Sequence, residues 1–124
     1  MKILIVDDDD ARHQNFASRF ADRADLYHAY GYPSAVDALD RSVFDLILLD
    51  HDLCIASTES CGPYGRELTG QDVARYIAEL PKVWRPKQII VHSWNAAGAK
   101  AIMRILQAAG FKPIYDPFPV KSLR

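Results

Sequence analysis

Apolar and polar positions repeat along this chain with two different periods, and the runs of apolar residues predict five strands. The runs at 2–6, 44–49 and 88–91 are rich in Ile, Leu and Val and contain few polar residues, which is typical of strands covered on both faces. The runs at 25–30 and 111–115 are interrupted by polar residues or by proline, which indicates strands at the edges of a sheet.

Between these runs the apolar residues follow helical spacing, which predicts four helices. Each predicted helix has residues that favour its start or its end. The starts are Asp9 or Asp10 for the first, Pro33 and Ser34 with Asp37 as a capping-box acid for the second, Thr69 for the third and Asn95 for the fourth, which Gly110 ends.

The alternation of strands and helices predicts an α/β fold, a doubly wound five-stranded parallel sheet with right-handed crossovers. Placing the two weakest strands at the edges gives the order 2-1-3-4-5 of flavodoxin-like folds. The last helix is reduced to 120–124 or absent, and we expect a single domain over 1–124.

In that strand order, polar residues after the first, third and fourth strands meet at one crevice. Ligands bind at the carboxyl ends of the strands in such sheets, so the crevice is the candidate site. Its residues are Asp7 and Asp8 after the first strand, Asp50, His51 and Asp52 after the third, and His92, Ser93 and Asn95 after the fourth. His92 and Ser93 can both face the crevice only if the strand ends before them.

The composition narrows the partners and the compartment. With 15 basic against 16 acidic residues there is no basic field for duplex DNA, whereas a nucleotide or an RNA terminus remains compatible. The first apolar run is too short for a signal peptide or a membrane span, so we expect no membrane partner and a cytoplasmic location. In a reducing compartment Cys54 and Cys61 are expected to be free thiols.

Several segments resemble the receiver domains of two-component response regulators. They are Ile3–Asp8 followed by Arg12, Asp45–Asp50, Thr69-Gly70 before a helix, and Asp116-Pro117-Phe118. The resemblance implies a metal-holding acidic pair at Asp7 and Asp8, a phosphoacceptor at Asp50 and a phosphoryl-sensing hydroxyl at Ser93.

Two features depart from the receiver pattern. Asp116 stands where receivers carry a lysine before Pro-Phe, and an aspartate there would repel a phosphoryl group. A loop of about fifteen residues follows Asp50.

The departures themselves resemble the cyclic-phosphate processing receiver-like family. The matching motifs are Leu-Asp-His-Asp-Leu at 49–53, Gly-Gln-Asp-Val at 70–73 and Val-His-Ser-Trp-Asn at 91–95, followed by Gly98-Ala99. The resemblance implies a phosphoesterase acting on a cyclic phosphate.

The residue chemistry agrees with such a reaction. Hydrolysis of a cyclic phosphodiester needs a base for water and an acid for the leaving oxygen, and imidazole suits both roles. His51 and His92 can divide them, with Asp52 fixing the tautomer of one ring. Ser93 and Asn95, with helix amides at 96–98, can bind the phosphate oxygens. Asp7, Asp8 and Asp50 can hold Mg²⁺ or Mn²⁺.

Each of these residue sets also has a purely structural interpretation. The histidines can be hydrogen-bonded structural residues, the Ser93–Asn95 segment a turn and helix cap, and Asp7 and Asp8 a cap of the first helix. Trp94 can stack a base or cover the sheet. The loop 54–66, with Tyr64 and Arg66, can be a substrate lid or a surface excursion. His13 and His28 are expected at the surface or partly buried.

Two further functions stay open beside hydrolysis. One is a degenerate receiver that acts by binding a partner. The other is an active receiver phosphorylated at Asp50. Because Asp116 removes the usual cation, the sequence predicts no stable acyl phosphate on Asp50.

Overall fold

The computed structural model describes residues 1–53 and 68–123, which form a parallel sheet with helices on both faces. Its strands are β1 (Lys2–Val6), β2 (Asp25–Ala29), β3 (Leu46–Leu49), β4 (Gln88–Val91) and β5 (Ile114–Tyr115). Its helices are α1 (Asp10–Phe20), α2 (Tyr32–Arg41), α3 (Gly70–Ala78) and α4 (Ala96–Ala108), with short 3₁₀ turns η1 (Ala21–Arg23) and η2 (Lys82–Trp84). The predictions on Cys54, Cys61, Tyr64 and Arg66 lie outside the described residues.

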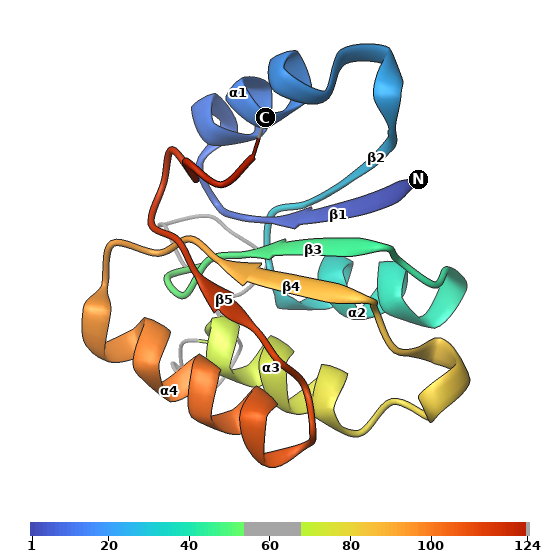
Figure 1. Cartoon of the computed structure of the whole chain (residues 1–124), viewed down its shortest axis with the longest axis vertical. Coiled ribbons are helices and arrows are strands. Elements are labelled where there is room, and N and C mark those ends of the chain that lie inside the picture. The colour runs from blue at the N-terminus through green and yellow to red at the C-terminus, as the bar shows by residue number, and fades with distance from the viewer. Residues whose placement is uncertain (54–67, 124) are drawn as a thin grey trace.

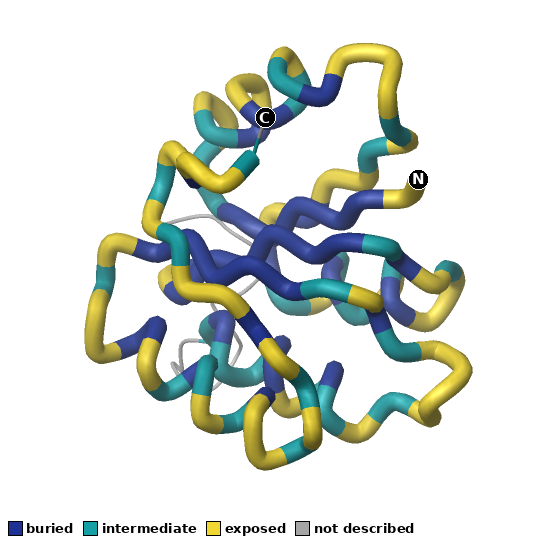
Figure 2. The backbone as a smooth tube through the Cα atoms, viewed as in Figure 1, coloured by how far each residue is buried: buried dark blue, intermediate teal, exposed yellow. Residues whose placement is uncertain are grey.

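The strand order is β2-β1-β3-β4-β5 with every pair parallel, so the predicted fold class and order are confirmed. Helix α1 covers one face, and α2, α3 and α4 cover the other (Figure 1). The three central strands are the most deeply buried part of the backbone (Figure 2). Residues of β1 and β3 have exposed fractions of 0–8% from Ile3 onward, which explains why their sequences are continuous apolar runs.

The chain after β5 crosses the α1 face of the sheet instead of forming a helix. Residues 117–123 run as turns and end beside α1 (Figure 1). Val120 is completely buried there, in a cluster with Ile5, Phe16 and Ile90. Arg19 of α1 donates hydrogen bonds to the carbonyl oxygens of Pro119, Val120 and Leu123. Within the described residues, no helix follows β5.

Most predicted helix signals are confirmed. The Asp9 side chain accepts from the amides of Ala11 and Arg12 at the start of α1. Thr69 caps α3, and its own amide donates to Asp72 at 2.9 Å. Gly110 follows α4 with a φ of 94°, the left-handed conformation that glycine tolerates at a helix end.

The predicted start of α2 is one residue late, and its predicted capping box is wrong. The helix begins at Tyr32 after Gly31, so Pro33 and Ser34 already lie inside its first turn. The Ser34 hydroxyl contacts the Gly31 amide at 3.4 Å and fills the role expected of Asp37, which instead pairs with Arg41 at 3.0 Å. A glycine in extended backbone can precede a helix without a capping side chain. The polar residues therefore place the capping box one turn too late, at Ser34 and Asp37 instead of Gly31 and Ser34.

No helix of the described residues is long and apolar enough to cross a membrane.

Candidate functional site

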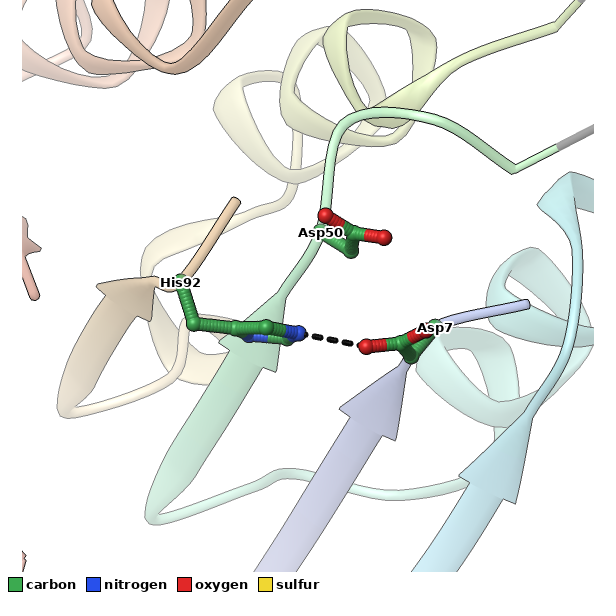
Figure 3. A group of neighbouring side chains, drawn as sticks. All are labelled: Asp7, Asp50 and His92. Atoms are coloured by element: carbon green, nitrogen blue, oxygen red, sulfur yellow. Dashed lines mark hydrogen bonds and ion pairs between the residues drawn. The ribbon is translucent and has the colours of Figure 1, made fainter. Parts of the chain in front are cut away.

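The site lies where β1, β3 and β4 end together. Asp7, Asp50 and His92 are the first residues after these three strands, and their side chains converge on one point (Figure 3). All three are buried, with exposed fractions of 0%, 5% and 1%. Because β4 ends at Val91, His92 and Ser93 no longer alternate across the sheet, and both line the same pocket.

Asp7 and His92 form a hydrogen-bonded pair across the crevice. Nε2 of His92 donates to Oδ2 of Asp7 at 2.7 Å. The other ring nitrogen, Nδ1, is buried and has no hydrogen-bond partner among the described residues. An imidazole held by a carboxylate at one nitrogen and free at the other is the arrangement used for proton transfer. The ring also meets Phe16 edge-on, with a centroid distance of 5.3 Å.

Arg12 reaches into the same cluster from the first turn of α1. Its guanidinium donates to Asp7 at 2.7 and 2.8 Å and to Asp50 at 3.3 Å. It also lies 3.5 Å from Oδ1 of Asp8. Arg12 is marked in the sequence only by its place in the receiver motif, and the sequence assigns it no role. Asp7 precedes α1, so no helical spacing links the two residues, and that place in the motif is the one signal for Arg12.

The carboxyl groups respond differently to this environment. Burial alone would raise the pKa of Asp7, but hydrogen bonds from His92 and Arg12 outweigh it and lower the pKa to about 2. Burial, followed by the charges of Asp50 and Asp7, raises the pKa of Asp8 to about 6. Burial, followed by the charge of Asp7, also raises the pKa of Asp50. Asp7 is thus ionised at neutral pH, whereas the pKa of Asp8 lies close enough to neutral pH for its carboxyl group to exchange a proton.

His51 lies on the other side of β3, between the starts of α3 and α4. Its Nδ1 donates to Asp52 at 2.9 Å, and its Nε2 pairs with the side-chain amide of Gln71 at 2.9 Å. The Asp52 carboxylate therefore lies where it can fix the tautomer of the His51 ring. His51 itself is not among the residues that line the pocket.

The pocket has a volume of about 130 Å³. It is lined by Arg12, Asp50, Asp52, His92, Ser93, Trp94, Asn95 and Phe118. Five of the eight predicted site residues thus face one cavity. Asp7 and Asp8 are not among the lining residues. Asp7 is hydrogen-bonded to Arg12 and His92, and Asp8 forms an ion pair with Arg12.

Ser93 and Asn95 also have the structural roles that the sequence allows. The Ser93 hydroxyl accepts from the Asn95 amide at 3.0 Å, and the Asn95 side chain caps α4 by accepting from Gly98 at 2.9 Å. Both side chains nevertheless line the pocket at the start of α4, where a helix dipole favours an anion.

Asp116 does not lie in the pocket. Its carboxylate accepts from the amides of Lys121 and Ser122 and holds the C-terminal turn. The repulsion of a phosphoryl group by Asp116 stays a prediction. Arg12 supplies a cation beside Asp50 instead.

Asp7, Asp50 and His92 offer ligand atoms within 4.8 Å of one another, so this group could hold a metal ion. His92 stands in the place that the sequence predicts for Asp8. In the structure, however, the carboxylate of Asp7 is already bonded by Arg12 and His92. A metal would have to displace one of them.

His13 differs from its expected position. It is 1% exposed, and its Nε2 donates to the backbone oxygen of Asp7 at 2.7 Å. Its partner His28 is exposed, as expected.

Solved structures with the same fold include bacterial receiver domains and response regulators. A response regulator from Burkholderia pseudomallei with a phosphorylated aspartic acid and a calcium ion shares 17% identity over 99% of this chain and 66% of its own, with a TM-score of 0.68. The receiver domain of a sensor histidine kinase from Pseudomonas aeruginosa, with magnesium in its active site cleft, is 21% identical. The match covers 97% of this chain and 86% of that domain, with a TM-score of 0.68. A non-phosphorylated receiver domain from Leptospira biflexa is 23% identical. The match covers 95% of this chain and 82% of that domain, with a TM-score of 0.65. These likenesses show the fold.

No curated protein matches the chain. The family model of the cyclic-phosphate processing receiver domain matches residues 2–108, a range that holds every residue of the pocket except Phe118. The chain therefore belongs to the cyclic-phosphate processing receiver domain family.

Proposed function

We propose that this protein is a phosphoesterase that opens a cyclic phosphate on a nucleotide or an RNA terminus by hydrolysis. The observation that carries the proposal is the Asp7–His92 pair, because His92 is one of the residues that line a pocket together with Arg12 and the start of α4. These are a proton-transfer group and two anion-binding groups in one cavity.

The pocket size supports a phosphate-sized ligand group. Its volume of about 130 Å³ is well below the roughly 300–1,000 Å³ of pockets that enclose a drug-sized ligand. A cyclic phosphate would enter, and the rest of the nucleotide would remain outside.

Trp94 supports a nucleotide as the bearer of that phosphate. Its side chain lines the pocket and the residue is 70% exposed. The indole N–H donates to the Phe118 carbonyl at 2.8 Å, which fixes the ring. A fixed, exposed aromatic face is a platform on which a base can stack.

The acidic lining favours substrate over product. A cyclic phosphodiester carries one negative charge, whereas the monoester formed by ring opening ionises a second time near pH 6. Asp50 and Asp52 in the wall repel the product more than the substrate, which promotes product release.

In the proposed reaction, water attacks phosphorus and one P–O ester bond breaks. The lone pair on Nδ1 of His92 takes the water proton, while Asp7 stabilises the imidazolium through Nε2. The leaving oxygen takes a proton that His51, starting as an imidazolium, gives up from Nδ1 through Asp52, so that His51 ends the step neutral; Asp52 faces the pocket and His51 lies behind it. Arg12, Ser93 and Asn95 bind the phosphate oxygens.

A divalent ion such as Mg²⁺ or Mn²⁺ would stabilise phosphoryl charge when bound. The sequence assigns its ligands to Asp7, Asp8 and Asp50. None of the proposed proton transfers requires it.

The test is hydrolysis of 2′,3′-cyclic and 3′,5′-cyclic nucleotides by the wild type and by His51→Ala, His92→Ala and the double variant. We expect each single change to reduce turnover by about 10² to 10⁴. The double variant should lose much less turnover than the product of the two single losses, because the residues act as a unit. Circular dichroism checks that each variant folds. Turnover close to wild type in His92→Ala would refute the proposal, and the same result in His51→Ala would remove only the second pair.

One contact favours a second function. The Arg12 guanidinium at 3.3 Å from Asp50 provides the cation that a phosphorylated aspartate needs, so the receiver function remains open. Incubation with acetyl phosphate separates the two. A hydrolase gives no stable modification, whereas stoichiometric, hydroxylamine-labile phosphorylation of Asp50 supports the receiver. Inactivity in both assays supports a receiver that only binds a partner.

A further inference from the structure

Arg12 occupies the centre of the acidic cluster, where a receiver-like site would accept a cation. Its side chain is 23% exposed, while those of Asp7 and Asp50 are 0% and 7% exposed. The guanidinium bridges these two carboxylates from one side, with bonds of 2.7 and 2.8 Å to Asp7 and 3.3 Å to Asp50. Arg12 thereby joins the ends of β1 and β3.

The hydrogen bonds of Asp7 leave no room for a metal ion. Its Oδ1 accepts from Nη2 of Arg12 and from the Asp9 amide, both at 2.8 Å. Its Oδ2 accepts from Nε of Arg12 and Nε2 of His92, both at 2.7 Å. An ionised carboxylate has about four lone-pair sites, and here four donors fill them. With Arg12 in place, the site does not fit the metal that the fold suggests.

We propose that Arg12 is the resident cation of this site and excludes divalent metal ions from Asp7 and Asp50. A guanidinium matches a carboxylate through two parallel bonds and stays charged at every pH at which the protein folds. Mg²⁺ must give up water to bind and demands octahedral geometry, so it competes poorly against a cation already seated on the same chain. The inference concerns the same pocket as the proposed hydrolysis but does not require it.

The charge balance predicts how the site changes when Arg12 is lost. Asp7, Asp8 and Asp50 would then face one another without their guanidinium, and their mutual repulsion would destabilise the fold. The ligand atoms of Asp7, Asp50 and His92 lie within 4.8 Å of one another, so a divalent ion could relieve this repulsion. Removal of Arg12 should convert a metal-excluding site into a metal-binding one.

Thermal melting and calorimetric titration with Mg²⁺ and Mn²⁺ test this in Arg12→Gln. Arg41→Gln is the matched control, because Arg41 pairs with Asp37 on an exposed surface, where its side chain is 76% exposed. We expect the wild type and the control to change little with metal. Arg12→Gln should melt at a lower temperature without metal, regain several degrees with it, and bind Mn²⁺ at least about tenfold more tightly than the wild type. Asp50→Asn in the Arg12→Gln background should abolish the gained binding.

Two outcomes would overturn the proposal: equal metal affinity in the wild type and Arg12→Gln, or binding in neither. If Arg12→Gln does not fold, Arg12→Lys decides. A lysine keeps the charge but cannot form the bidentate contact with Asp7, so its metal affinity should exceed that of the wild type, and equality would refute the proposal. Because the readout is metal binding, failure here is distinct from a lack of hydrolysis.

Discussion

Two histidines hold Asp7 from different sides. His92 donates to its carboxylate, and His13 donates from Nε2 to its backbone oxygen, both at 2.7 Å. Since Nε2 of His13 carries the proton, its Nδ1 must accept the 2.7 Å hydrogen bond from His28. The ring also stacks on Tyr30 at a centroid distance of 4.0 Å. The hydrogen bond that His13 accepts from His28 therefore requires His13 in its neutral form.

This arrangement predicts an acid-sensitive contribution to stability. Burial, assisted by His28, lowers the pKa of His13 below its ordinary 6.5. The unfolded chain therefore binds the proton more readily, so the contribution of His13 is complete above pH 6.5 and is lost as the pH falls toward the lowered pKa. His13→Gln should make the free energy of unfolding fall less steeply between about pH 7.5 and 5. Parallel pH curves for the two proteins, or an NMR titration that places the pKa of the His13 ring at or above its ordinary value, would contradict this.

At the scale of elements, α3 and α4 close around the segment that carries Asp50 and His51. The amide of Gly70 donates to the backbone oxygen of His51 at 2.7 Å. A Cβ at Gly70 would overlap the Asp50 backbone oxygen, and one at Gly98 would overlap the His51 ring. Each helix therefore has a glycine in its first turn at the contact, because only a bare backbone can approach the segment so closely.

The two glycines should differ in their tolerance of alanine. Alanine favours a helix by about 1 kcal/mol over glycine, whereas forcing atoms into a packed core costs about 1–3 kcal/mol. At Gly98 the obstacle is a side chain that can rotate, so Gly98→Ala should displace His51 with a modest loss of stability. At Gly70 the obstacle is backbone, and Gly70→Ala should lose more. Chemical denaturation measures both, and a Gly70→Ala variant as stable as Gly98→Ala would contradict the difference.

The sequence predicts these elements well where burial alone determines the pattern. Strands β1, β3 and β4 are covered on both faces, so their apolar runs and their order could be predicted, and with them the convergence of Asp7, Asp50 and His92. β5 is predicted too long, because only Ile114 and Tyr115 pair with the sheet.

Side-chain contacts between elements could not be predicted in the same way. The bridge from Arg12 to Asp50 joins residues 38 positions apart, and no local pattern specifies it. The burial of His13 depends on its pairing with His28 and Asp7. The separation of His51 from the pocket follows from side-chain direction, since Leu49 and His51 point to the α3–α4 side of the sheet.

At the scale of the molecule, the C-terminal segment completes the fold and the site together. The helices of the described residues cover the two faces of the sheet unevenly, and α1 lies alone on its side (Figure 1). Residues 117–123 cover the rest of that face, with Val120 buried beside Phe16. The same segment brings Phe118 to the pocket, and its amide donates to the His92 backbone oxygen at 2.9 Å.

Val120 should therefore affect both stability and the pocket. Its φ of 64° is unusual for a β-branched residue, and its complete burial offsets this strain. Val120→Ala keeps the positive φ but removes buried methyl groups, which should cost about 1–2 kcal/mol of unfolding free energy.

Val120→Asp buries an unpaired charge and should release the segment from α1 and Phe118 from the pocket. Hydrogen exchange then should rise at residues 118–123 while the central strands stay protected. Leu123→Ala is the control, because Leu123 is only half-buried and lies farther from the pocket along the chain. If Val120→Asp exchanged no faster than the wild type in this segment, the packing of Val120 would not be the contact that holds the C-terminal segment on the sheet.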